Sequence, residues 1–251
     1  DFRERPSHAD QLHVDLWWRG QNIACDAGTY LYNGQAPWQN GLAHTEAHNT
    51  VTVDEADQML WLSRFTWGAW ARGQVLSSGL RGWQGEHDGY ARLGVQHIRS
   101  VLALEGDRWL IVDHLAGRQS RHYSLHWLIN DLPYSVMQEQ NKIVLWPESH
   151  RSQIQMGLME GRGNLSVMRA DPNSRRGWRS RYYGQKEPAL SVRFETDSMQ
   201  ACFWTFFGSD GDSLSLSNQK LNLQMGRRSI EISLMELSMP DEFKNLLSSL
   251  G

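Results

Sequence analysis

The sequence predicts an all-β protein, built as a large antiparallel β-sandwich with a short C-terminal helix. Apolar and polar residues alternate along most of the chain, as they do in strands that bury one face. Turn-forming residues interrupt these runs at intervals of about 8–12 residues, the spacing typical of sandwiches and barrels. Long amphipathic helices do not separate the strands, so a parallel α/β sheet is not expected.

The first two strands are expected to form a hairpin. Residues 12–17 are apolar at every second position, and residues 23–25 return after the turn signal at 19–22. The later strands are expected, in chain order, at residues 50–53, 73–77, 95–104, 109–115, 122–129, 134–138, 142–146, 153–159, 165–170, 189–196, 201–207, 214–217, 220–225 and 229–237.

Two segments depart from the strand pattern. Residues 171–188 form the longest polar stretch, with four arginines, and are expected to be a loop. Residues 240–247 are expected to be a helix, because a proline opens them and acids fill the first turn. We therefore divide the chain into a sandwich, residues 1–237, and a helical tail, residues 238–251.

Composition excludes several classes of protein. The 251 residues carry 25 Lys and Arg against 28 Asp and Glu, a net charge of −3, without the basic stripe of a nucleic-acid binder. The chain has no apolar run of the roughly 18 residues that membrane insertion requires. Two cysteines exclude a disulfide framework and a cysteine-rich zinc module. The alternating pattern starts without a linker, so we expect a piece of a longer polypeptide.

A candidate metal site lies near the N-terminus. A hairpin about Gly20 brings the start of its first strand and the end of its second to the same end of the sheet, so His8 and Asp26 can meet there. His48 precedes another strand and can reach the same place. Two imidazoles and a carboxylate suit Zn²⁺. Spacing alone nevertheless favours the alternative that these are surface residues, because no local motif such as HExxH is present.

Three segments, in this order, resemble the C-terminal domain of the heparinase II/III-like polysaccharide lyases: Ser7-His8-Ala9-Asp10, Asp26-Ala27-Gly28-Thr29-Tyr30 and Ala47-His48-Asn49-Thr50-Val51. Residues 89–93, 97–99 and 109–113 also look like this family, so the resemblance extends to about residue 115. It implies a β-sandwich that joins an N-terminal α/α-toroid in the complete enzyme. It also implies cleavage of uronate-containing polysaccharides by β-elimination.

The resemblance further implies a zinc site with His8, Asp26 and His48 as ligands, and it places Tyr30 in the substrate cleft. Family members often carry another histidine two residues before the first ligand. Here that position is Pro6, so any role of that histidine does not transfer. The family's main base and acid lie on the toroid, which this chain lacks. We favour a structural zinc that pins three loops, with Tyr30 as acid, base or orienting group.

Several side chains are substrate-binding candidates, each with a plainer alternative. His44 and Glu46 share a segment with His48, and solvent-exposed loop residues are an equal alternative. Trp38 is the best candidate for an exposed platform for sugar rings, although most of the 12 tryptophans are assigned to packing. His97 faces the same side of a strand as Arg99 and can contact a polyanion, but a satisfied, half-buried histidine is the favoured alternative.

The leading hypothesis is therefore the sandwich part of a lyase acting on an acidic polysaccharide. The alternative is a non-catalytic carbohydrate-binding or structural module. Hydrolysis by paired carboxylates is weaker, because no such pair is placed by a motif. Polymeric substrates favour a periplasmic or secreted location, while the identity of the polysaccharide stays open.

Overall fold

The computed structural model describes residues 6–147 and 151–250. Its strands are β1 (Leu16–Trp18), β2 (Gln21–Ala24), β3 (Val51–Val53), β4 (Leu60–Ser63), β5 (Thr66–Gly68), β6 (Gly73–Gly79), β7 (Gly82–His87), β8 (Val95–Leu104), β9 (Arg108–Asn130), β10 (Tyr134–Met137), β11 (Lys142–Leu145), β12 (Ser152–Leu158), β13 (Asn164–Arg169), β14 (Trp178–Tyr182), β15 (Gln185–Ser209), β16 (Ser213–Ser217), β17 (Lys220–Met225) and β18 (Arg228–Ser233). Its helices are η1 (Gly41–Ala43), η2 (Thr45–Ala47), η3 (Ala91–Leu93), η4 (Gln138–Gln140), α1 (Leu234–Ser238) and α2 (Pro240–Leu250).

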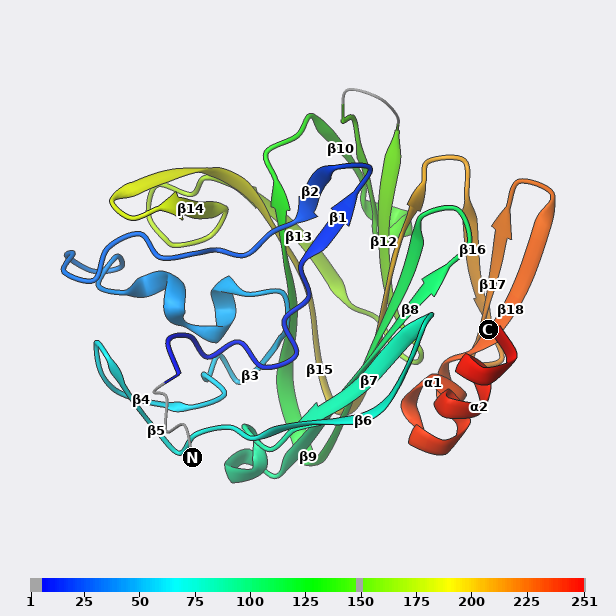
Figure 1. Cartoon of the computed structure of the whole chain (residues 1–251), viewed down its shortest axis with the longest axis horizontal. Helices are drawn as coiled ribbons and strands as arrows, with labels where there is room; N and C mark the ends of the chain where they lie inside the picture. Colours follow the sequence, from blue (N-terminus) through cyan, green and yellow to red (C-terminus); the bar gives the residue numbers. More distant parts are fainter. Residues whose placement is uncertain (1–5, 148–150, 251) are drawn as a thin grey trace.

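The described strands form one large antiparallel sheet and two small ones (Figure 1). The large sheet has 13 strands, and its main path runs β10-β11-β12-β15-β9-β8-β7-β6. Strands β13 and β14 pair with β15, whereas β2 and β3 pair with β9, and β1 pairs with β2. Strands β16, β17 and β18 form a second sheet, and β4 and β5 a third.

Two long strands, β9 and β15, organise the large sheet. They pair along nearly their whole length, with a shift of register between Ser198 and Gln200. Each replaces two shorter strands that the sequence predicted, at 109–115 and 122–129 and at 189–196 and 201–207. Polar residues interrupt the apolar alternation in the middle of both strands. The sequence pattern therefore predicted two short strands where the structure has one long strand.

The two halves of these strands face each other across the main core. Trp127 on the second half of β9 contacts Phe207 with ring centroids 5.0 Å apart. It also donates a hydrogen bond from Nε1 to Thr205 Oγ1 at 3.1 Å. Phe194 and Phe203, on opposite halves of β15, lie 6.2 Å apart. The large sheet therefore closes on itself as a sandwich, which confirms the predicted fold class.

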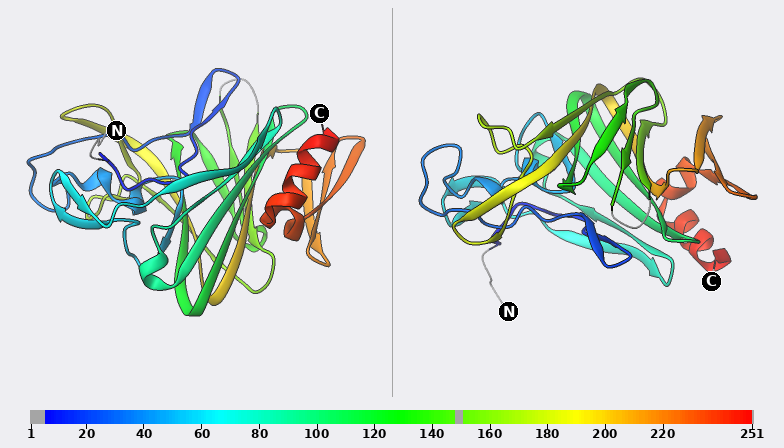
Figure 2. Two further views of the ribbon diagram at one scale, coloured as in Figure 1. Left: turned by 60° about the horizontal axis from the view of Figure 1, so that its bottom comes forward. Right: turned by 90° about the horizontal axis from the view of Figure 1, so that it is seen from above.

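A second core covers the opposite face of β15. Cys202, Trp204 and Phe206 alternate with the residues of the main core and pack with β17, β18 and both C-terminal helices. Figure 2 shows these helices and the small sheet together on one side of the large sheet. Because both faces of this half of β15 are buried, residues 201–207 form a nearly continuous apolar run. The tail thus belongs to the packed structure.

Local differences from the prediction have identifiable causes. Strand β1 begins only at Leu16, because Leu12 adopts a φ of +61° that breaks the extended backbone. The last strand ends at Ser233, whose side chain accepts a hydrogen bond from the Glu236 N–H and so caps α1. Strands β4, β5, β7 and β14 were not predicted, and β14 lies within the segment that was expected to be a loop. No described helix has the length and apolar character needed to cross a bilayer.

Candidate metal centre

The three predicted ligands lie together. His8 lies in the segment before β1, Asp26 follows β2, and His48 follows η2. Their potential ligand atoms, together with one from Asp10, all lie within 4.8 Å of one another. His48 Nδ1 is 3.3 Å from Asp26 Oδ2, and the rings of His8 and His48 are 4.9 Å apart. Asp10 was not predicted as a ligand, although it ends the segment that carried the resemblance.

A tight turn holds the aspartate in place. The N–H of Gly28 donates to Asp26 Oδ1 at 2.5 Å, as in the turns that aspartate commonly forms with its own backbone. Gly28 has a φ of +68°, and a Cβ at this position would lie 1.9 Å from the carbonyl oxygen of Ser180. Only glycine fits this position. The sequence Asp-Ala-Gly is therefore required by the turn that presents the carboxylate.

Asn49 links the segments that carry the cluster. Its side-chain amide donates to the carbonyl oxygens of Val14 and Cys25 at 2.9 and 3.0 Å. Its Oδ1 accepts from the N–H of Leu128 on β9 at 2.6 Å, and its own N–H donates to His13 Nδ1 at 3.0 Å. The residue is fully buried, and its hydrogen bonds replace the water that these groups would otherwise bind.

A buried ion pair between Arg99 and Asp113 lies next to the segments that carry the cluster. Arg99 donates from Nε and Nη2 to the two carboxylate oxygens of Asp113, at 2.7 and 3.0 Å. Its Nη1 donates to the carbonyl oxygens of Leu12 and Asn49. The fork geometry of the guanidinium makes this possible, because five N–H groups point in fixed directions. Arg99 thus fixes the backbone on two sides of the histidine cluster.

Two properties of the clustered side chains suit a divalent cation: the protonation states of His8 and Asp26, and the lack of hydrogen bonds at His48 within the described part of the chain. His48 is fully buried, and neither of its ring nitrogens has a hydrogen bond of good geometry among the described residues, although Nδ1 lies 3.3 Å from the Asp26 carboxylate. Burial and the neighbouring His48 lower the pKa of His8, so that His8 is neutral, the form that binds metal. Burial raises the pKa of Asp26, but the proximity of His48 and His13 and the Gly28 N–H outweigh it and hold the pKa well below its usual range.

His13 also faces the cluster but has a different role. Its Nδ1 accepts the Asn49 N–H, so the proton of the neutral ring is on Nε2. That nitrogen lies 3.7 Å from Asp26 Oδ2, beyond hydrogen-bond distance, and it is buried without a hydrogen-bond partner among the described residues. Burial, then the charge of His48, lowers the pKa of His13 to about 4. His13 is therefore a neutral imidazole beside the candidate ligands. The sequence did not predict this position, because His13 lies within an alternating segment.

Tyr30 and Trp38 lie in an aromatic cluster rather than on an open surface. Their rings contact edge to face, with centroids 5.4 Å apart. The ammonium of Lys186 lies 3.7 Å from the Trp38 ring centroid, 4.0 Å from that of Trp178 and 5.6 Å from that of Tyr30. A lysine over the ring is a cation–π contact. Trp38 is half-buried and is not the exposed platform that the sequence predicted.

The other three candidates have partners within the chain. His44 Nδ1 contacts Asp57 Oδ2 at 2.7 Å. Glu46 forms ion pairs with both Arg175 and Arg193.

His97 is fully buried, with both ring nitrogens in hydrogen bonds, to His87 at 2.9 Å and Asp113 at 2.7 Å. It is therefore a structural residue without a free nitrogen for a substrate, and it is more deeply buried than the favoured alternative expected.

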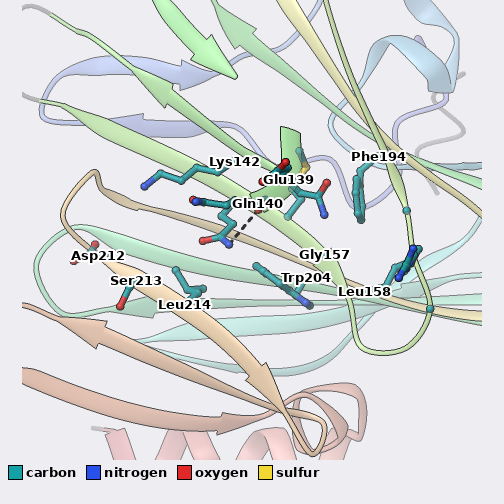
Figure 3. A pocket seen from close by; sticks show the side chains of 16 residues that line it. Glu139, Gln140, Lys142, Gly157, Leu158, Phe194, Trp204, Asp212, Ser213 and Leu214 are labelled. Carbon is teal, nitrogen blue, oxygen red and sulfur yellow. Dashed lines mark hydrogen bonds between the residues drawn. The ribbon is translucent and has the colours of Figure 1, made fainter. Parts of the chain in front are cut away.

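One large cavity lies away from these side chains. It has a volume of about 790 Å³, and Figure 3 shows that it is lined by residues of β11, β12, β15 and the start of β16. Trp204 packs against Gly157 there, where a Cβ would lie 2.4 Å from the indole. The Gln155 side chain donates to the carbonyl oxygen of Gln140 at 3.2 Å. None of the cluster histidines lines this cavity.

A family model described as heparinase II/III-like, C-terminal, matches residues 2–220. The chain belongs to this family. The predicted resemblance is thereby confirmed, and it extends over more of the chain than the segments that suggested it.

Other comparisons agree with this assignment. The heparinase II/III-like chain is 26% identical over 191 residues to a heparin-sulfate lyase of Bacteroides stercoris, covering 74% of this chain and 26% of the lyase. It is 25% identical over 134 residues to that of Pedobacter heparinus, covering 52% and 19%. A crystal structure of a heparan sulfate lyase mutant from Pedobacter heparinus shares the fold, with a TM-score of 0.71 at 19% identity, covering 90% of this chain and 36% of that chain. The chain thus spans 26% or less of the length of these curated relatives.

Proposed function

We propose that this chain is the β-sandwich part of a polysaccharide lyase, which cleaves uronic-acid-containing polysaccharide by β-elimination. It contributes a metal site and one wall of the substrate cleft. The observation that carries this proposal is the convergence of His8, Asp26 and His48, from three separate segments, beside the segment of Tyr30. The names of the relatives support an acidic polysaccharide as the substrate.

The chemistry sets requirements that this chain meets only in part. Elimination across C4–C5 of a uronate needs its carboxylate neutralised, a base for the C5 proton and an acid for the leaving O4. Tyr30 is the group of this chain that we assign to proton transfer or orientation. Because the chain spans a minor part of its relatives, we assign the remaining groups to an N-terminal α/α-toroid part of the same protein.

The metal that suits the site best is Zn²⁺, given two imidazoles and a carboxylate. His8, Asp26 and His48 would hold it, with Asp10 beside them. When bound, it supplies positive charge that fixes its ligands and joins the segments that carry them. The Gly28 N–H holds one oxygen of the Asp26 carboxylate, and His13 Nε2 lies 3.7 Å from the other. This role is structural, because none of these residues needs to touch the sugar.

A non-catalytic carbohydrate-binding or structural module is the second candidate. Two observations favour it: Pro6 stands where relatives often have a histidine, and Tyr30 is packed against Trp38. Under this candidate the same metal centre stabilises the sandwich, and the chain binds glycan without turnover.

Elemental analysis and an activity assay of the chain joined to its upstream region test the proposal. We expect about one zinc per chain and ultraviolet absorbance from unsaturated uronate products. His48→Ala should lose the zinc and the product together, whereas the control His122→Ala, at a half-buried position outside the cluster, should keep both. A folded, metal-free protein that releases no product from any uronate polymer would leave only the binding module.

A further inference from the structure

A second cavity lies on the same side of the fold as the histidine cluster. Its volume is about 630 Å³, within the range of about 300–1,000 Å³ found for small-ligand sites. Four segments far apart in the sequence line it: the loop before η1, His44, the β4–β5 hairpin and the loop before β14. The lining residues are Ala36, Pro37, Gln39, His44, Trp61, Ser63, Arg64 and Arg175.

Aromatic contacts connect this cavity to the metal cluster. Trp67 contacts both Trp61 and His44, with ring centroids 4.8 and 5.8 Å away. The indole Nε1 of Trp67 also donates to the carbonyl oxygen of Ser7 at 3.5 Å, directly before His8. Trp67 therefore links two residues that line the cavity, Trp61 and His44, to the segment that carries His8.

The charge at the cavity is unbalanced toward positive. Arg64 and Arg175 line the cavity, and no carboxylate of the described chain does; Arg175 pairs with Glu46, which lies outside the lining and also pairs with Arg193. Arg64 has no carboxylate within 4.0 Å among the residues that the structure describes. Its side chain contacts Asn33 Oδ1, while its Nε is buried without a hydrogen-bond partner. Because buried donors are nearly always bonded, this N–H marks the place of an absent acceptor.

The remaining lining supplies a flat apolar surface. Trp61 stacks at an angle on His44, with centroids 4.7 Å apart, and Asp57 fixes that imidazole through Nδ1. An indole beside two guanidinium groups suits a sugar ring that carries an anionic substituent. The ring's C–H face packs on the indole, and planar guanidinium groups bind sulfate or carboxylate through two parallel N–H groups.

We propose that this cavity is an anion subsite for an acidic sugar unit. Arg64 and Arg175 bind a sulfate or carboxylate group, and Trp61 packs against the sugar ring. This inference rests on the proposed function, because it deepens the choice of substrate at the same cleft. Under this proposal, the β4–β5 hairpin and the loop before β14 select sugar units by their negative charge, and the metal ligands do not.

Binding of defined oligosaccharides to the 251-residue chain tests the subsite. Two probes of equal length are titrated calorimetrically at low salt: an unsulfated glucuronate-containing octasaccharide and its N-sulfated counterpart. Arg64→Gln should weaken binding about tenfold, the effect of losing one charged hydrogen bond. Ser63→Glu, at an exposed lining position, should weaken it similarly without disturbing packing. The control Arg162→Gln, exposed at the other cavity, should leave affinity unchanged.

Each result decides a specific point. A loss confined to the N-sulfated probe identifies the occupant as sulfate, and a loss with both probes identifies it as carboxylate; both support the subsite. Wild-type affinity in Arg64→Gln and Ser63→Glu, or an equal loss in Arg162→Gln, overturns it. The two proposals fail separately: lost binding in these variants without unsaturated product from the full-length protein refutes the lyase but keeps the subsite.

Discussion

The amide of Asn49 donates a hydrogen bond to the carbonyl oxygen of Cys25 at 3.0 Å, so the residue after one candidate ligand is bonded to the residue before another. His48 and Asp26 are thereby held at a fixed separation by a backbone contact that involves neither of their side chains. The separation of these two candidate ligands is therefore set in part by a hydrogen bond outside the cluster itself.

Loss of the Asn49 amide should disrupt both stability and metal binding. Asn49→Asp keeps the oxygen that accepts from Leu128 but removes both donors, which leaves two buried carbonyl groups unpaired. We expect a loss of at least about 2 kcal/mol in the free energy of unfolding, measured with urea, and weaker zinc retention. Asn164→Asp, at an exposed position of β13, is the matched control and should change stability by less than about 0.5 kcal/mol.

Glycine at position 28 should be irreplaceable. Gly28→Ala imposes a φ of +68° on alanine and drives its Cβ into the Ser180 carbonyl, so we expect a destabilisation above about 2 kcal/mol and a lower zinc content. Gly184→Ala provides the comparison, because its φ is +79° but nothing lies within 4 Å of the added Cβ. That variant should lose only about 1 kcal/mol and keep its zinc. Equal effects in the two variants would show that contact with Ser180 is unimportant.

Zinc should stabilise the protein through His48. A ligand that binds only the folded state adds about 2.7 kcal/mol at one hundred times its dissociation constant. We therefore expect chelation to lower the melting temperature of the wild-type chain. His48→Ala should melt at the same temperature with and without zinc, whereas His122→Ala, at a half-buried site outside the cluster, should respond as the wild type does. A chelator that leaves the wild-type melting curve unchanged would contradict a folding role for the metal.

Acid should destabilise the fold below a pH of about 6.5 through two buried histidines. His87 Nδ1 accepts the Gly89 N–H, so its Nε2–H donates to His97, which in turn donates to Asp113. Burial lowers the pKa of both rings. The charges of His97 and Arg99 add to this effect at His87, whereas at His97 the hydrogen bond and charge of Asp113 oppose burial without outweighing it. Below pH 6.5 the unfolded chain therefore binds more protons than the folded chain, and stability is lost as the pH falls toward the folded-state values.

Each histidine should contribute a slope of about 1.4 kcal/mol per pH unit in that range. Urea unfolding measured between pH 7.5 and about 5 gives the slope. His87→Gln should reduce the slope of stability against pH by about 1.4 kcal/mol per pH unit, the contribution of one histidine. A stability that does not change over this range would show that the folded and unfolded chains take up the same number of protons, which contradicts the lowered pKa values.

Part of this structure could be predicted from the sequence because the signals are local. Period-two alternation located β8 at its observed bounds, and each predicted metal ligand lies next to a strand or turn with its own sequence signature. The partners of Glu46, Arg175 and Arg193, are 129 and 147 residues away, so its ion pairs leave no trace in a short window. The same holds for His97, whose alternating segment does not reveal Asp113 on the neighbouring strand.

The contact between Asn49 and Leu128, which lie 79 residues apart, also has a consequence for how the protein folds. Contacts with such large sequence separation form slowly, because a long loop must close before they give any stability. The cluster of His8, Asp26 and His48 reaches its final shape only after β9 has docked onto the N-terminal segments. Assembly of this candidate metal site is therefore expected late in folding, after the long-range strand pairing of the large sheet has formed.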